Sequence, residues 1–179
     1  MKTINQTLFI ILCFTLPIRI YSQTTGNKTV SVTLPVVTLM DVEPAGNINL
    51  SFTAPTEAGK PIVNPAPNTT KWINYTSAIS LGGVNRRITA SINQVIPGVD
   101  IKLQAAAASG SGGGTLGIPS AQITLTTTPI TIINGIGGAF TGNGSNNGHQ
   151  LTITLAPNTY ANLSAISNTP VIITYTITE

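Results

Sequence analysis

The stretch VIITYTITE, residues 171–179, places a large apolar side chain at every second position. These side chains belong to Val171, Ile173, Tyr175 and Ile177, and threonine stands between the last three of them. Such alternation predicts a β-strand with one face toward a core and one toward solvent. A strand as apolar as this must be paired or covered, because an open edge recruits other strands.

The same period of two recurs throughout the chain after residue 23. It predicts further strands at residues 30–34, 48–52, 73–75, 88–92, 101–105, 123–125, 130–132 and 151–155. Glycine and proline clusters separate these segments, and none of them shows a helical period of 3.6 residues. The sequence therefore predicts an all-β fold, an antiparallel immunoglobulin-like β-sandwich of about seven to nine strands.

Residues 1–23, MKTINQTLFIILCFTLPIRIYSQ, predict a secretory signal peptide. Their apolar stretch is about ten residues long, and a membrane-spanning helix needs about twenty. We therefore expect a leader at 1–23, a single β-sandwich domain at 24–179, and export to the cell surface or the extracellular space. We expect no integral membrane span in the mature chain, and no disulfide either, because Cys13 leaves with the leader.

The composition argues against most enzyme classes. The 179 residues are 41% hydrophobic and only 7% charged, with one histidine, one cysteine and five acidic residues. These are too few groups for most catalytic or metal centres, so we expect no catalytic, cofactor-binding or metal-binding residues and no cofactor. Only Arg86 and Arg87 are adjacent basic residues. Nucleic-acid binding needs several cations on one face, so we expect no nucleic-acid partner.

Several residues are candidates for a functional site. His149 ends the loop GNGSNNGH and is expected to be solvated, and residues 109–117 and 142–148 are expected to be flexible hairpin connections. Asp41 and Glu43 would share a face of an extended segment, which is too little for paired-carboxylate glycosidase chemistry. Trp72 and Tyr75 are three residues apart and would face opposite sides of a strand. One of these two aromatic residues is therefore expected in the core.

Four segments carry a resemblance to known proteins: GNINLSFTAP (46–55), KWINYTSAI (71–79), RRITASIN (86–93) and the closing VIITYTITE. Together they resemble a family of small exported β-sandwich proteins from Bacteroidetes. They are similar, more distantly, to the pilin-like and spore-coat-U-like subunits of chaperone-usher systems. In that group a missing strand is supplied first by a periplasmic chaperone and then by the N-terminal extension of the next subunit.

Carried over, the resemblance implies an assembly edge made from the two ends of the chain. Its residues would be Val30, Val32, Leu34, Val171, Ile173, Tyr175 and Ile177, with Val36 or Val37 continuing the first group. Pro35 deletes an amide donor, so the segments on its two sides are expected to pair differently. The chain departs from the group because it lacks the disulfide of the N-terminal half, and because nine strands could complete a sandwich unaided.

The sequence thus predicts a secreted or cell-surface structural or adhesive subunit, pilin-like or fimbrial, that is not an enzyme and assembles by strand addition. Its expected partners are further copies of the chain, other surface subunits or a periplasmic chaperone. The alternative is a secreted carbohydrate-binding module that acts through its Gly/Asn-rich loops. A weaker alternative, an exported hydrolase, would depend on Asp41 and Glu43.

Overall fold

The structure of the protein, a computed structural model, describes residues 25–179. The leader predicted at residues 1–23 lies outside the described residues. A compact unit spans Pro35–Glu179. The described residues form these elements: β1 (Val37–Glu43), β2 (Asn68–Ala78), β3 (Arg86–Ile92), β4 (Val99–Ala105), β5 (Gly113–Pro119), β6 (Ile123–Thr124), β7 (Ile130–Phe140), β8 (His149–Pro157), the 3-10 helix η1 (Tyr160–Asn162) and β9 (Ile173–Thr178).

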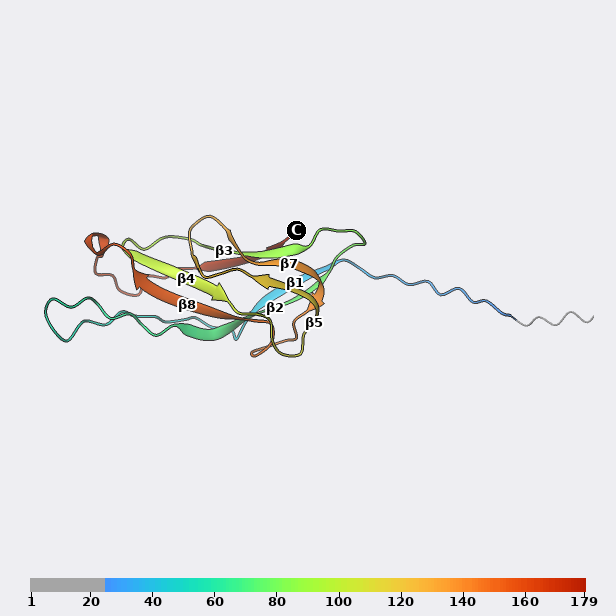
Figure 1. Cartoon of the computed structure of the whole chain (residues 1–179), viewed down its shortest axis with the longest axis horizontal. Coiled ribbons are helices and arrows are strands. Elements are labelled where there is room, and N and C mark those ends of the chain that lie inside the picture. The colour runs from blue at the N-terminus through green and yellow to red at the C-terminus, as the bar shows by residue number, and fades with distance from the viewer. Residues whose placement is uncertain (1–24) are drawn as a thin grey trace, which may run out of the picture. The chain divides into compact units, whose positions relative to one another are not determined.

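The compact unit is an antiparallel β-sandwich, as the alternation predicted. The strands follow the order β6-β4-β8-β2-β7-β3-β9, with β1 added to β2 and β5 added to β7. Strand β2 connects the two halves, because residues 68–73 pair with β8 and residues 76–77 pair with β7. The continuous sheet folds over at this strand, which places β3 in one layer and β8 in the other (Figure 1).

Isoleucine and leucine from both layers fill the core. The buried apolar side chains are Ile73, Tyr75, Ile88, Ala90, Ile92, Ile101, Leu103, Ala105, Leu125, Ile132, Ile133, Ile136, Ala139, Leu151 and Ile153. Most of them occupy alternate positions of their strands, because a pleated strand turns every second side chain to the same face. Within residues 25–179, no helix is long and apolar enough to cross a membrane.

Two predicted strands are wrong. Residues 30–34 form no strand, and Val30, Val32 and Leu34 are 80%, 86% and 83% exposed. Residues 48–52 also form no strand, although Ile48 and Leu50 pack half-buried against the core. The second segment leads into a proline-rich loop, where missing amide donors limit pairing to one isolated bridge between Thr53 and Val63.

Two observed strands were not predicted. Strand β1 has apolar side chains on both faces, since Leu39 points outward while Met40 and Val42 pack against the core. Strand β5 runs through the stretch expected to be a flexible connection. It was not predicted because its glycines add no side chains to an alternating pattern. At Gly117, φ is +78° and an added Cβ would lie 2.8 Å from the carbonyl oxygen of Asn134. Glycine therefore permits a close approach of β5 to β7.

Candidate functional site

Strand β1 has one open edge. Among the described residues β1 pairs only with β2, in a register that places Met40 opposite Tyr75. The Tyr75 backbone bonds away from β1, because its N–H donates to Thr141 Oγ1 at 2.9 Å and its carbonyl accepts from Thr141 N–H at 3.0 Å. Since bonded and non-bonded pairs alternate in an antiparallel ladder, Thr38, Met40 and Val42 direct their N–H and C=O groups to the open edge.

Strand β9 has an open edge of the same kind. Among residues 25–179 it pairs only with β3, and Ile92 lies opposite Ile173. The Ile92 N–H donates instead to Thr126 O at 2.9 Å, whereas Asn93 N–H donates to Ile172 O at 3.1 Å. The same alternation therefore directs the backbone groups of Ile173, Tyr175 and Ile177 away from β3. These are three of the residues predicted for the assembly edge.

The apolar side chains of both edge strands are only half covered. Met40 and Val42 from β1 and Ile173, Tyr175 and Ile177 from β9 pack against the core while remaining partly exposed. Burial raises the pKa of the Tyr175 phenol above its ordinary value. Val171 is likewise half-buried against the core, although it precedes β9. An extended chain laid along either edge could therefore bond to the backbone and also cover apolar surface.

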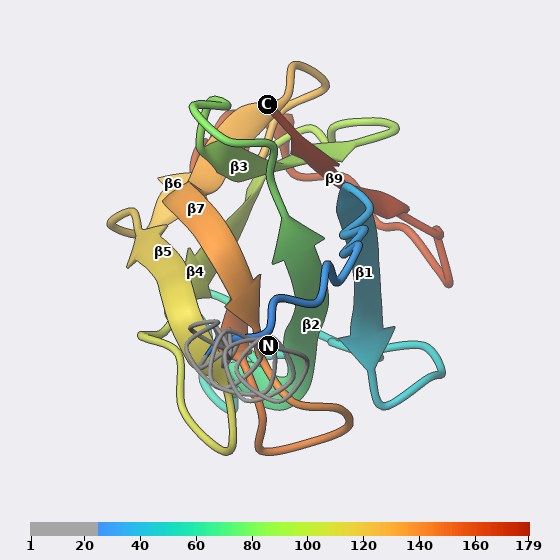
Figure 2. The same cartoon turned by 90° about the vertical axis from the view of Figure 1, so that its right-hand side faces the viewer.

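Arg86 connects the two edge strands at one end. Its side chain is 3% exposed, and Nη1 donates to Val37 O at 2.6 Å and to Ser77 Oγ at 2.9 Å. Nη2 lies 3.5 Å from Oε1 of Glu179, the residue after β9. Figure 2 shows β1 and β9 on the same side of the compact unit. Arg86 thus fixes the start of β1 and reaches the end of β9.

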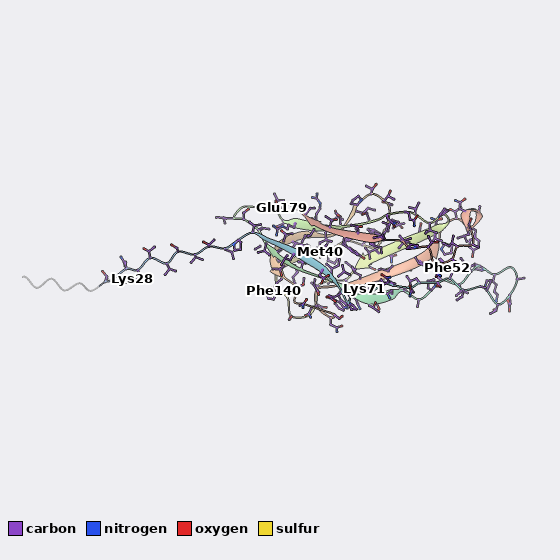
Figure 3. All side chains as sticks on the ribbon, turned by 180° about the vertical axis from the view of Figure 1, so that it is seen from behind. Lys28, Met40, Phe52, Lys71, Phe140 and Glu179 are labelled. Carbon is purple, nitrogen blue, oxygen red and sulfur yellow. The ribbon has the colours of Figure 1, made fainter. Side chains whose placement is uncertain are left out.

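Lys71 holds the other end of β1. Lys71 is on β2 and is labelled in Figure 3. Its side chain is buried, and Nζ donates to the carbonyl of Pro44 and, at 2.7 Å, to that of Gly46. A buried ammonium group needs such acceptors, because desolvation without hydrogen bonds is costly. Strand β1 is therefore an edge strand, and hydrogen bonds from buried cations hold both of its ends.

The N-terminal residues predicted for the assembly edge lie in an extended segment. Residues 25–36 contain no strand, and Val30, Val32 and Leu34 are largely exposed. Their side chains alternate with Ser31 and Thr33, which keeps the pattern of a strand without its pairing. A single exposed apolar side chain is ordinary, but alternating ones in unpaired backbone are typical of segments that add to a sheet.

The structure corrects the expectation for His149, which is fully buried rather than solvated. Its Nδ1 lies 2.8 Å from Ala106 O, and its Nε2 lies 3.0 Å from Oη of Tyr75, which donates to Leu116 O. The two rings stack with centroids 5.8 Å apart. Of the Trp72 and Tyr75 pair, Tyr75 is the aromatic residue in the core, and burial raises the pKa of its phenol above the ordinary value. These bonds join β2 and β8 to the stretch containing β5.

Asp41 and Glu43 do not form the pair of free, facing carboxylates that glycosidase chemistry needs. Asp41 Oδ1 accepts the Val42 N–H at 2.7 Å, and Glu43 is at the end of β1, in register with Trp72. Within residues 25–179, no three His, Cys, Asp or Glu side chains come together where they could hold a metal ion.

One shallow hollow adjoins the loop at residues 142–148. Its volume is about 460 Å³, and it is lined by Leu39, Met40, Asp41, Asn74, Tyr75, Thr76, Phe140, Gly142 and Asn143. Asn74 Nδ2 donates to Asn147 O at 2.7 Å, while its buried Oδ1 has no hydrogen-bond partner among the described residues. The expectation of a flexible connection does not describe this loop well, because Asn147 also accepts from Ser111 N–H at 3.0 Å.

No family model matches the chain, and neither the curated proteins nor the solved structures searched give a match.

Replacing Arg86 with methionine should test the anchoring of β1. We expect Arg86→Met to lower the free energy of unfolding by at least about 1.5 kcal/mol, because it removes the charged donor that bonds to the Val37 carbonyl and the buried Ser77 hydroxyl. The exposed neighbour supplies the control, and Arg87→Met should change stability by less than about 0.5 kcal/mol. Urea unfolding measures both. Equal stability of the two variants would contradict the anchoring role.

Proposed function

We propose that the protein is a secreted or cell-surface structural subunit, pilin-like and non-catalytic, that assembles by strand addition. The observation that carries this proposal is that one chain holds open strand edges and an exposed, alternating apolar segment, which would be the two halves of a strand-addition contact. The acceptor half is the pair of open edges on β1 and β9, and the donor half is the exposed alternating segment at residues 29–36. Export rests on the leader predicted at residues 1–23.

The acceptor edges are suited to an extended partner. Each presents three residues whose N–H and C=O groups are directed away from the paired strand, with half-covered apolar side chains beside them. Main-chain bonds would supply affinity, and alternate side chains would supply specificity, as in other cases of β-augmentation. Residues 30, 32 and 34 would direct one leucine and two valines toward the core.

The local sequence favours donation to another copy over folding back. Only Pro35 and Val36 separate Leu34 from β1. A two-residue hairpin needs positive φ at its first central residue or at both. Proline is fixed near −65°, and a β-branched valine disfavours positive φ. Such a reversal onto the same β1 is therefore disfavoured, and a second copy or another surface subunit is the better recipient.

Size-exclusion chromatography with light scattering tests assembly, using the chain from residue 24 onward, which contains every described residue. We expect a ladder of oligomers. Val32→Asp should weaken association at least about tenfold, because one buried apolar side chain contributes about 1.5–3 kcal/mol. Thr33→Asp introduces the same charge on the opposite face and should leave the ladder intact. A wild-type chain that stays monomeric, or equal loss in both variants, would contradict the proposal.

A carbohydrate-binding module is the second candidate, and the hollow beside the Gly/Asn-rich loop is the observation that favours it. The exposed Phe140 offers an apolar face, and Asp41, Thr76 and Asn143 offer polar groups beside it. A monomer that is retained on immobilised polysaccharide, and that loses retention on Phe140→Ala, would favour this function over assembly.

A further inference from the structure

The side chain of Asp41 occupies part of the open edge of β1. Its Oδ1 accepts the backbone N–H of Val42 at 2.7 Å. This N–H is one of the three that β1 directs away from β2. The carboxylate therefore takes the position that the carbonyl of an added strand would need.

Asp41 forms no ion pair within the described part of the chain. The salt bridges there join Lys60 with Glu57 and Arg86 with Glu179. The Asp41 side chain is instead exposed and bonded to its own strand. A hydrogen bond to a charged group is about twice as strong as a neutral one, so an incoming carbonyl replaces a good acceptor with an ordinary one.

The neighbouring carboxylate cannot act in the same way. Glu43 lies two residues further along β1, but the residue that follows it is Pro44. Proline has no N–H, so Glu43 has no corresponding backbone donor to cap. Glu43 is therefore a matched comparison: it has the same charge and the same strand but lacks the contact.

We propose that Asp41 is a guard residue of the open edge of β1. By this we mean that its carboxylate bonds to the edge and weakens strand addition until a matching segment displaces it. This proposal rests on the proposed function, and the segment that displaces the carboxylate is residues 29–36 of a second copy. Charged side chains on edge strands commonly limit indiscriminate edge pairing. Here the charge also holds a backbone donor that the added strand must take over.

The test measures peptide affinity by fluorescence anisotropy. The acceptor is the chain from residue 24 with Val32→Asp, which is expected to be a poor donor, and the probe is a labelled synthetic peptide of residues 25–36. We expect Asp41→Ala to bind the peptide about fivefold more tightly than the parent, because no internal acceptor must be displaced. Asp41→Asn should fall between them, because an amide oxygen can still accept but carries no charge. Glu43→Gln should bind like the parent.

The outcomes distinguish failure of the proposed role of Asp41 from failure of strand addition itself. If the parent binds the peptide and Asp41→Ala binds it with equal or lower affinity, the guard is overturned while strand addition stands. Equal tightening by Glu43→Gln would also overturn it, because the effect would then be one of net charge. If neither the parent nor Asp41→Ala binds the peptide, the proposed function fails and the guard fails with it. Urea unfolding of each variant verifies that the acceptor is folded.

Discussion

Backbone hydrogen bonding along β1 and β9 is the constraint on which the functional account depends. In an antiparallel pair only every second residue bonds to its partner strand, so each edge strand leaves a row of donors and acceptors without a partner strand. Strand β1 leaves Thr38, Met40 and Val42 in this state, and Asp41 supplies one acceptor for Val42. An antiparallel sandwich can cover its core and still leave backbone donors and acceptors without a partner strand at its edges.

The rest of the compact unit keeps the edges in a fixed conformation. Arg86 and Lys71 place buried cations against backbone carbonyls at the two ends of β1. The buried pair of Tyr75 and His149 links β2 and β8 to Leu116 of β5 and to Ala106, which follows β4. The net stability that such contacts add is reduced by the desolvation cost of the buried charge, although removing one member is still costly because its partners lose their donor. A preformed edge loses less entropy when a strand is added.

Alternation in the sequence was enough to predict the fold class, and its limits are clear at particular residues. It identified the core-facing residues of β3, β4 and β8, because those strands bury one face. It failed for residues 30–34, where the same pattern occurs without a pairing partner, since period alone cannot distinguish a paired strand from an exposed extended segment. It missed β5 because Gly117 has no side chain to contribute to a pattern. His149 could have been placed correctly, because it continues the alternation of Leu151 and Ile153.

Residue-resolved amide hydrogen exchange would test the central claim most directly. The Val32→Asp chain would be compared before and after addition of the peptide of residues 25–36. The account predicts slower exchange at Met40 and Val42 of β1 and at Ile173 and Tyr175 of β9, with little change at Leu39, whose N–H already faces β2. Binding of the peptide without protection at either edge would contradict the account.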